Sequence, residues 1–541
     1  MIGEPPLHFS DIEPRSRRIA AFLGYLGIHK GDKVALLSEN RPEWGLTYFG
    51  ISRSGAVAVP ILTDFMPEQI GNILEHSEAK AVFVSKRFLP KVEKEGERRL
   101  VLSVEDLAVL AGPKGAKGPS PAEIDAAAAA FSPPRIVGDD LASIVYTSGT
   151  TGLSKGVMLT HKNLVWDAKG CCSIIVLNRR DRLLSILPLA HTYEFTLGLI
   201  LPLLQGSAVY YLDRPPSATA LLPALKSIRP TIMLTVPLVI DKIYRTSVLP
   251  ALEKISLYKS PLFRPLLERI AGKKLYKTFG GKLRFFGVGG APLAADVEAF
   301  LIAGRFPYAI GYGLTETAPM AAGFHPFKGA PRSTGPAMRG VEVRVADPRP
   351  DTREGEIQIR GPNVTQGYYL DPARTAEAFT PDGFFKTGDL GYFDEKGRLY
   401  IRGRSKTMIL GASGENIYPE EVEAVLNRSP YVQESLVYGD ESGITALIQL
   451  KPEVLQELAA RVKDGVEGAE LAASHLGHAA GEAFQSAEHA AAHLLERIKK
   501  EANAKLASFS RIGTVEHHAE PFEKTPTQKI KRFLYPRKKD N

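Results

Sequence analysis

The sequence predicts an α/β protein with a large N-terminal domain of stacked, mainly parallel sheets and a small α+β domain at the C-terminus. Short apolar runs alternate with longer amphipathic stretches over residues 33–290. Such alternation is typical of layered α/β folds. Brief alternating strands separated by Gly and Pro follow from about 341 to 402, and a new mixed pattern begins after Arg404.

Buried strands are expected where several apolar residues follow one another, and helices where apolar residues recur at helical spacing, as from Pro14 to Leu26. Because parallel strands need crossover connections, the alternation of the two patterns favours parallel sheets. The expected strands lie in the runs at 33–38, 56–61, 81–85, 182–188, 232–237 and 283–290.

Three later segments differ from this pattern. Residues 341–402 contain VEVRVA, GEIQIRG and GRLYIRG, which predict a small antiparallel β-barrel or sheet. Residues 453–505 are rich in Ala, Glu and His at helical spacing, so one or two helices, exposed or packed against a partner, are expected there. The Ala-, Gly- and Pro-rich stretch 111–135 is interpreted as a surface excursion within the first domain.

The composition is that of an ordinary globular protein with more than one domain, since 44% of the 541 residues are hydrophobic and 24% are charged. The two cysteines, Cys171 and Cys172, are adjacent, so a disulfide framework is excluded and a cytoplasmic location is expected. The N-terminus lacks the residue order of a signal peptide, and the longest apolar run, 195–212, contains turn formers, so no membrane span is expected.

The formal net charge of +8 favours anionic partners. It leaves open whether these are anionic substrates or an anionic membrane surface to which the protein binds peripherally. The basic runs at 497–500 and 537–539 are interpreted as solvated surface. No basic patch is interleaved with aromatic residues, so nucleic acid is not expected as a partner.

The strongest single motif is YTSGTTGLSKGVMLTHKN at residues 146–163, where a β-prone run enters a loop of Ser, Thr and Gly. Such a loop presents backbone N–H groups and hydroxyls to phosphate oxygens, and glycine lets the backbone approach closely. Lys155 adds a mobile positive charge. The motif lacks the GK[ST] ending of a Walker A loop, which disfavours a P-loop ATPase.

Further motifs follow this loop in the order found in the adenylate-forming, or AMP-binding, superfamily. That family includes acyl-CoA synthetases, peptide-synthetase adenylation domains and luciferases, and the chain resembles it over nearly its whole length. The ordered set is far more specific than any one motif. The motifs are LPLAHTYE (187–194), GVGGAPL (287–293), GYGLTET (311–317), KTGDLG (386–391), GRSKTMIL (403–410), GENIYPEEVE (414–423) and KTPTQKIKR (524–532).

The resemblance implies an ATP site whose loop clamps the β- and γ-phosphates. Tyr312 is expected to stack on adenine, Thr315 to hydrogen-bond the α-phosphate and Glu316 to hold Mg²⁺. Asp389 is expected to accept hydrogen bonds from both ribose hydroxyls, with Arg404 beside it. The complete expected set for ATP and AMP is Thr147, Ser148, Gly149, Thr150, Thr151, Gly152, Lys155, Gly290, Ala291, Pro292, Gly311, Tyr312, Gly313, Thr315, Asp389 and Arg404.

The resemblance also implies a mobile C-terminal domain at 407–541 that carries the catalytic lysine, Lys529, and contains a helical insertion at about 453–505. The N-terminal AMP-binding domain would span 1–402, and the hinge 403–406 would turn at Lys406. In the second half-reaction a thiol must reach the acyl carbonyl, but the domain that carries the lysine occupies that side during adenylation. The domain must therefore rotate. The loop at Gly414 would then face the pantetheine of CoA.

Among family members, the chain looks most like bacterial long-chain fatty acid:CoA ligases, because Gln528 precedes Lys529 and an apolar run follows LPLAHTYE. His191 is placed near the acyl site by this likeness, with a packed core histidine as the other interpretation. The implied substrates and cofactors are a fatty acid, ATP, Mg²⁺ and CoA. An acyl carrier protein as acceptor, a medium-chain or aryl acid as substrate, and a non-catalytic nucleotide and acyl sensor stay open.

Overall fold

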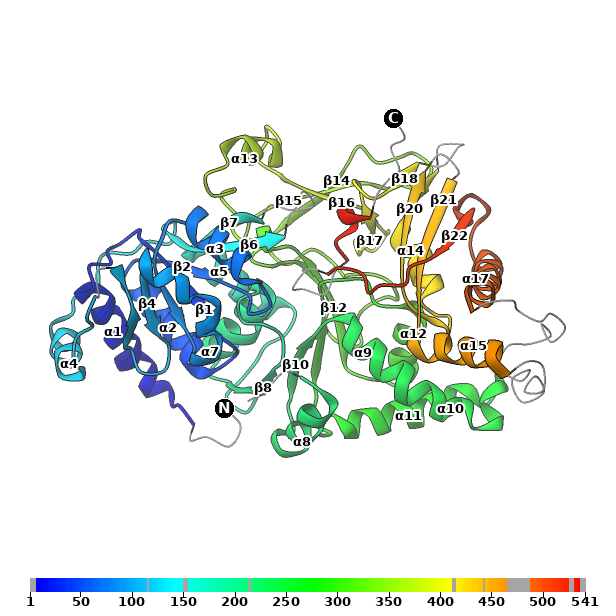
Figure 1. Cartoon of the computed structure of the whole chain (residues 1–541), viewed down its shortest axis with the longest axis horizontal. Helices are drawn as coiled ribbons and strands as arrows, with labels where there is room; N and C mark the ends of the chain where they lie inside the picture. The colour runs from blue at the N-terminus through cyan, green and yellow to red at the C-terminus, as the bar shows by residue number, and fades with distance from the viewer. Residues whose placement is uncertain are drawn as a thin grey trace. The chain divides into compact units, whose positions relative to one another are not determined.

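The computed structural model of the chain describes residues 6–113, 116–148, 154–212, 216–410, 415–440, 443–464, 487–524 and 530–535. The chain divides into two compact units, whose elements are labelled in Figure 1. The first contains Met1–Gly149, Leu153–Thr387 and Gly391–Ile401, and the second contains Gly388–Leu390 and Arg402–Asn541. Within the described ranges, no helix has both the length and the apolar character needed to cross a bilayer.

The N-terminal sheet of the first unit has seven strands in the order β5-β4-β3-β1-β2-β6-β7. The central pairs are parallel, and the edge pairs β4–β5 and β6–β7 are antiparallel. The central strands are almost wholly apolar because both faces of a parallel sheet are covered. The strands are β1 (Lys33–Leu37), β2 (Val57–Pro60), β3 (Ala79–Val84), β4 (Leu100–Ser103), β5 (Val109–Ala111), β6 (Leu141–Ser148) and β7 (Ser154–Thr160), and the helices of this region are α1 (Phe9–Tyr25), α2 (Pro42–Arg53), α3 (Pro67–His76), α4 (Pro121–Ala130) and α5 (His161–Gly170).

A second sheet of six strands has the order β13-β12-β11-β10-β8-β9, and only the pair β12–β13 is antiparallel. Its strands are β8 (Arg182–Ser185), β9 (Ala208–Tyr211), β10 (Ile232–Thr235), β11 (Phe285–Val288), β12 (Tyr308–Gly313) and β13 (Met320–Gly323). The helices of this region are α6 (Thr192–Glu194), α7 (Leu201–Leu204), α8 (Ala218–Ile228), α9 (Pro237–Ile243), α10 (Leu249–Glu253), α11 (Arg264–Thr278) and α12 (Ala295–Ala303).

One helix belongs to the cores of both sheets. It runs from Thr192 to Leu204 through α6, a wider π-helical turn at Phe195–Ile200 and α7, and we call it the 192–204 helix. Phe195 packs into the core of the first sheet, where its ring centroid lies 4.2 Å from that of Tyr48 on α2. Leu197 and Leu201 pack into the core of the second sheet. Most of the helix is therefore buried and most of its side chains are apolar, as expected for a helix between two cores, although it also contains Thr192, Glu194 and Thr196.

A four-stranded sheet, β14-β15-β16-β17, completes the first unit and continues into the second. Its strands are β14 (Glu342–Ala346), β15 (Gly355–Arg360), β16 (Phe385–Phe393) and β17 (Leu399–Arg404), and α13 (Pro372–Ala378) precedes β16. Among the described residues, β14 and β17 are not paired with each other, so an open sheet stands where a small barrel or sheet was expected.

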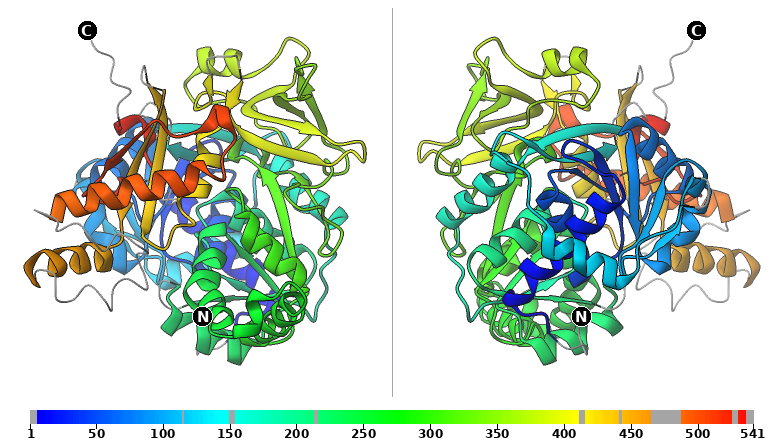
Figure 2. Two further views of the ribbon diagram at one scale, coloured as in Figure 1. Left: turned by 90° about the vertical axis from the view of Figure 1, so that its right-hand side faces the viewer. Right: turned by 90° about the vertical axis from the view of Figure 1, so that its left-hand side faces the viewer.

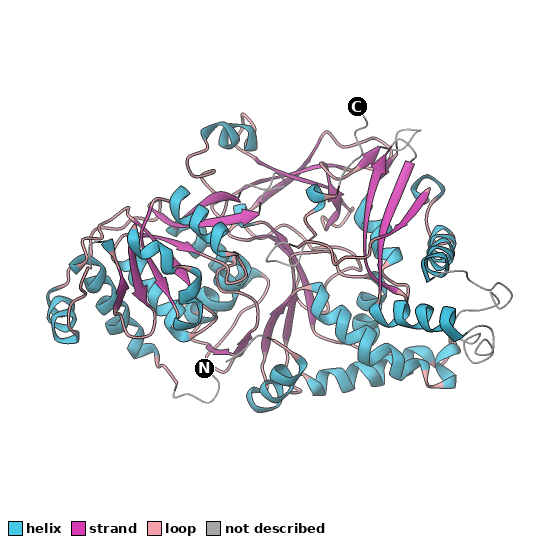
Figure 3. Cartoon of the chain, in the orientation of Figure 1, coloured by secondary structure: helices cyan, strands magenta, loops and turns pink. Residues whose placement is uncertain are grey.

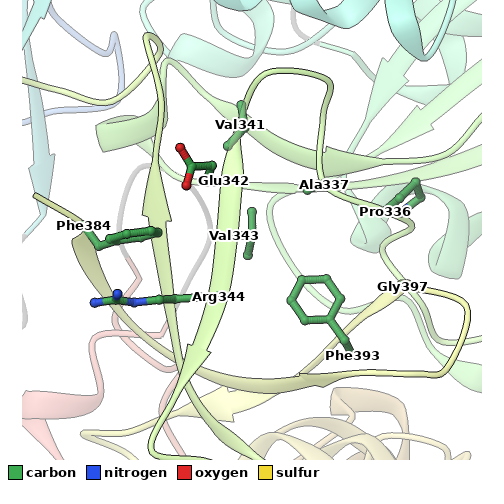
Figure 4. A pocket seen from close by; sticks show the side chains of 9 residues that line it. All are labelled: Pro336, Ala337, Val341, Glu342, Val343, Arg344, Phe384, Phe393 and Gly397. Carbon is green, nitrogen blue, oxygen red and sulfur yellow. The ribbon is translucent and has the colours of Figure 1, made fainter. Parts of the chain in front are cut away.

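An open hollow of about 550 Å³ lies on this sheet (Figure 4). Val341, Val343 and Phe393 line its apolar part. The guanidinium of Arg344 lies 3.9 Å from the centroid of the Phe384 ring and is also paired with Asp382. None of the site residues expected from the sequence lines the hollow.

The second unit is built on the sheet β20-β21-β22, with β20 (Val432–Asp440) and β21 (Gly443–Leu450) antiparallel and β22 (Thr514–His517) parallel to β21. Its α17 (Ala487–Asn503) contacts β22 and buries Leu494 and Ile498 in this unit's core, and Figure 2 shows α17 in orange along the sheet. The other elements are α14 (Pro419–Leu426), α15 (Pro452–Asp464) and the two-stranded ladder β18 (Ile409–Leu410) with β19 (Asn416–Ile417).

The predicted fold class is confirmed, and Figure 3 shows the mixture of strands and helices. Each of the six predicted strand runs overlaps a strand, and VEVRVA, GEIQIRG and GRLYIRG overlap β14, β15 and β17. The 111–135 stretch contains α4, whose Ser120 and Glu123 side chains form a capping box. The 453–505 stretch supplies α15 and α17, and its residues 465–486 lie outside the described part.

Candidate active site

The Ser/Thr/Gly loop connects two antiparallel strands. Thr147 and Ser148 end β6, and their register partners on β7 are Lys155 and Ser154. The β-branched and apolar residues that precede and follow the loop are buried in the first core, which fixes the hairpin. Strand pairing therefore places Lys155 beside Thr147, while Gly149, Thr150, Thr151 and Gly152 lie outside the described residues.

Lys155 meets Glu316, which comes from a motif 161 residues later. The Lys155 Nζ donates a hydrogen bond to Glu316 Oε1 at 2.7 Å and another to the Tyr368 hydroxyl at 2.9 Å. The Tyr368 hydroxyl in turn donates to Glu316 Oε1 at 3.0 Å. We call these three residues the Lys155 triad. Glu316 and Tyr368 are buried, so the triad is a polar cluster set into the first unit.

The backbone around Glu316 is fixed from several directions. Thr315 and Glu316 form a short turn after β12, and the Glu316 carbonyl accepts the Thr365 N–H at 2.8 Å. The Asn363 side-chain amide donates to the Thr317 carbonyl at 2.9 Å. At Gly313, a Cβ atom would lie 1.7 Å from the Pro319 oxygen, so only glycine fits there. The Glu316 side chain thus projects from a rigid turn.

The charge balance of the triad keeps Glu316 ionised. Burial alone raises the pKa of a carboxyl group, but the Lys155 ammonium and the hydrogen bonds from Lys155 and Tyr368 outweigh it and hold the pKa of Glu316 below its ordinary value. Both of these partners contact Oε1, so neither of them engages Oε2. An ionised carboxylate is a fitting ligand for Mg²⁺, which prefers hard oxygen donors.

The remaining residues of the first unit that are expected to bind the nucleotide lie at or after the carboxyl ends of two neighbouring parallel strands. Gly290, Ala291 and Pro292 follow β11, and these three residues are exposed. Gly311, Tyr312 and Gly313 end β12, which pairs with β11. Ligands of open α/β sheets bind beyond such strand ends. The Tyr312 side chain is largely buried and packs with the core of the second sheet.

Asp389 and Arg404 form a second cluster. The Arg404 Nε lies 2.8 Å from Asp389 Oδ1, and the carboxylate is buried while half of the arginine side chain is exposed. Lys406 is exposed in a turn in which the Thr407 and Met408 N–H groups donate to the Arg404 carbonyl. Lys529 and Gly414 lie outside the described residues. The roles expected for these residues stay predictions.

A small apolar cavity of about 20 Å³ lies beside β11, β12 and β13. Tyr193 and Leu197 of the 192–204 helix line it, together with Met320 and Ile174. Glycine makes room for these side chains, because a Cβ at Gly289 would lie 3.2 Å from the Tyr193 ring. His191 caps the same helix, since its Nδ1 accepts the Tyr193 N–H at 3.3 Å. His191 is therefore two residues from a side chain that lines an apolar cavity.

Glu194 was not predicted to matter, and the structure places it fully inside the protein. Its side chain is 0% exposed, and neither carboxylate oxygen has a hydrogen-bond partner among the described residues. Burial raises the pKa of Glu194 to about 8. A Cβ at Gly198 would lie 2.7 Å from the Glu194 carboxyl carbon, so glycine at 198 accommodates this side chain.

Replacing Glu194 by glutamine should remove a loss of stability that the wild type shows as pH rises, so the difference in unfolding free energy should shift in favour of the variant. Between its unfolded pKa of about 4.5 and its folded pKa of about 8, the folded wild type keeps a proton that the unfolded chain releases. Wild-type stability therefore falls as pH rises through this window, by about 1.4 kcal/mol per pKa unit at most, and Glu194→Gln lacks this loss. Urea midpoints measured across the window test this, with the exposed Glu68→Gln as control. A difference between variant and wild type that is independent of pH contradicts the expectation.

Comparison with known proteins identifies the family of the chain. A model of the family described as AMP-binding enzyme matches residues 6–369. The long-chain-fatty-acid–CoA ligase FadD15 of Mycobacterium bovis is 32% identical, over 95% of this chain and 88% of the relative. A 4-coumarate:CoA ligase of Petunia hybrida is 29% identical, over 79% of this chain and 76% of the relative.

Solved structures agree with this result. A crystal structure of ATP-bound MatB from Rhodopseudomonas palustris matches with a TM-score of 0.72 and 26% identity, over 97% of this chain and 92% of that one. The matched family region contains both ends of the Ser/Thr/Gly loop and all three members of the Lys155 triad. The chain therefore belongs to the AMP-binding enzyme family.

Proposed function

We propose that this acyl-CoA ligase activates long-chain fatty acids as acyl-adenylates and transfers the acyl group to CoA. ATP is consumed to AMP and pyrophosphate in the first step, with Mg²⁺ as cofactor. A long-chain acid is proposed because the similarity to a long-chain ligase extends over 95% of this chain, whereas the similarity to the 4-coumarate ligase extends over 79% of it. The apolar lining of the cavity beside Tyr193 supports the same choice.

A fatty acid offers this cavity little besides methylene groups. Each buried CH₂ contributes about 0.8 kcal/mol, so an apolar site can bind a long chain tightly without polar recognition. The 20 Å³ cavity is far smaller than such a chain, so side chains must move to admit it. Met320 is suited to this, because an unbranched methionine repacks easily and lies against Gly311 and Gly323.

The chemistry explains why the proposed residues carry positive charge and N–H donors. Attack of a carboxylate on the α-phosphate brings two anions together and expels pyrophosphate, so the barrier is largely electrostatic and positional. Lys155 is assigned to the leaving phosphates and Lys529 to the carboxylate and the α-phosphate, with Thr315 donating a hydrogen bond to the latter. Mg²⁺, held by Glu316, supplies further neutralisation of phosphate charge.

The two half-reactions are proposed to use different orientations of the C-terminal domain. In this scheme Asp389 and Arg404 hold the ribose, rotation at Lys406 withdraws Lys529, and the loop at Gly414 then faces CoA. His191 is placed at the acyl end of the site, where it orients the carboxylate. The exposed turn that contains Lys406 supports a hinge, since an exposed turn can change its dihedral angles without disturbing a core.

Carboxylate-dependent exchange of labelled pyrophosphate into ATP tests the function. Exchange should rise with acyl length to a long-chain optimum, and CoA should then accept the acyl group. An optimum with coumarate or another aryl acid would overturn the fatty acid as substrate. Transfer to acyl carrier protein but not to CoA would overturn the acceptor, and binding of ATP without any exchange would indicate a sensor.

Replacing Tyr368 by phenylalanine should raise the Mg²⁺ concentration for half-maximal activity by about tenfold, because hydrogen bonds to charged groups contribute about 1.5–3 kcal/mol. The ring and its packing stay, but the hydroxyl that orients Glu316 Oε1 is lost. Tyr369→Phe is the matched control, since its hydroxyl contacts Glu78 instead. An unchanged Mg²⁺ dependence in Tyr368→Phe would remove Tyr368 from the metal site.

A further inference from the structure

A stretch of apolar side chains is exposed on the surface around α11. Leu262 is 79% exposed, and Leu266 and Ile270 are each 58% exposed. Ile255, Leu257 and Phe263 are exposed beside them in sequence. Single exposed apolar side chains are common, but six within 16 residues are unfavourable in water and are typical of a surface that binds a partner or a membrane. We call residues 254–277 the α11 surface.

Leu266 and Ile270 belong to the face of α11 (Arg264–Thr278) that points away from the core, and the other four exposed apolar side chains precede this helix. Leu267 and Leu275 pack against the core of the second sheet, and Gly272 lies against Gly304. Leu266 and Ile270 are four residues apart and therefore share the opposite face of the helix. Lys273, Lys274 and Lys277 follow along the exposed side of the same helix. The helix thus has a packed face and a face that presents leucine, isoleucine and lysine to its surroundings.

Charge on this segment is strongly one-sided. Residues 253–282 contain eight Lys and Arg but only two acidic residues, a net charge of +6 in a chain whose total is +8. One of the two acids, Glu268, is buried and paired with Arg264 at 2.9 Å. Arg264 is thus neutralised, whereas among the described residues no acidic side chain pairs with Lys273, Lys274 or Lys277, which lie beside the exposed apolar side chains.

We infer that the α11 surface binds an anionic lipid bilayer. Apolar side chains enter the headgroup and acyl boundary, while long lysine side chains keep their ammonium groups at the level of anionic headgroups. Positive charge beside exposed leucine and isoleucine matches an anionic lipid surface in both respects, whereas an acidic protein partner would account for the charge alone. The proposed binding to the bilayer does not depend on which acid the enzyme activates.

Flotation with lipid vesicles, run without substrate, tests the inference. The intact chain should bind vesicles of phosphatidylcholine mixed with phosphatidylglycerol, bind weakly to phosphatidylcholine alone, and lose binding as salt rises. Replacing Lys273, Lys274 and Lys277 by serine should weaken binding to anionic vesicles by roughly 100-fold. Replacing Leu262, Leu266 and Ile270 by serine should weaken it by at least about tenfold.

Matched variants elsewhere should bind vesicles like the wild type. For charge, these are the exposed Lys94, Lys328 and Lys396 replaced by serine. For apolar area, they are the exposed Phe9, Met66 and Val176 replaced by serine. Pyrophosphate exchange with detergent-dispersed fatty acid should be unchanged in all four triple variants, which separates loss of docking from loss of folding or of the proposed activity.

Three outcomes would overturn the inference. One is equal binding to neutral and anionic vesicles, or equal loss in the control variants. Another is absence of vesicle binding together with a dimer in sedimentation that the Leu262, Leu266 and Ile270 variant dissolves, which would make the surface an interface between copies. The third is absence of vesicle binding together with acyl carrier protein binding that the lysine variant loses.

Discussion

Replacing Lys529 by alanine should lower the rate of adenylate formation by on the order of 100- to 1,000-fold, as expected for removal of one preorganised charge from a transition state. Adenylation concentrates negative charge at the α-phosphorus, and the proposed role of Lys529 is to bridge the entering carboxylate and that phosphate. Thioester formation from supplied acyl-adenylate should be spared, because the proposed rotation withdraws Lys529 before CoA reacts. Pyrophosphate exchange and single-turnover thioester formation measure the two half-reactions separately.

A neighbouring lysine provides the control for this experiment. Lys531 belongs to the same basic motif but pairs with Glu523, so Lys531→Ala should leave both half-reactions close to wild type. Equal loss of the two half-reactions in Lys529→Ala would contradict a role confined to adenylation. It would also remove the main argument for a rotating C-terminal domain in this chain.

Replacing Glu316 by glutamine should reduce adenylation by a similar 100- to 1,000-fold and make the remaining activity nearly insensitive to Mg²⁺. The substitution keeps the shape of the side chain but removes the charge that pairs with Lys155 at 2.7 Å. A neutral amide oxygen is a poor ligand for Mg²⁺, and Lys155 loses the partner that orients it. Activity measured across a Mg²⁺ titration separates loss of metal affinity from loss of the maximal rate.

Glu298 is a matched control because it is also a buried glutamate of the first unit, hydrogen-bonded to the Tyr308 hydroxyl and to the Arg332 N–H. Glu298→Gln shows whether neutralising a buried carboxylate outside the proposed metal site changes the adenylation rate. The assignment of Glu316 to the metal fails if Glu316→Gln keeps the Mg²⁺ dependence of the wild type.

The parts of the fold that were predicted are those whose pattern is local. β1 and β3 each contain a run of four apolar residues, and β14 and β15 alternate, so these patterns are visible without a partner strand. β5, with three residues, is too short to carry a period, and β12 ends in the glycine-rich GYG, which resembles a turn. Strands of this kind depend on their neighbours in the sheet, which a single sequence does not display.

The same distinction holds for the site. Lys155 and Glu316 were predicted from separate motifs, but their contact arises from the folding of two sheets and could not be read from either motif. Tyr368 carries no local signal and becomes part of the site only through tertiary packing. Glu194 stands in a recognised motif, LPLAHTYE, yet its burial could be predicted only by knowing that the 192–204 helix packs into the cores of both sheets.

The 192–204 helix lies between the cavity proposed as the acyl site and the core of the N-terminal sheet. Widening the cavity requires Tyr193 and Leu197 to move. Both belong to a helix whose Phe195 packs against the aromatic rings of Trp44 and Tyr48. Under the proposed function, an acid too bulky for the cavity would therefore strain α2, although Trp44 and Tyr48 of that helix do not line the cavity.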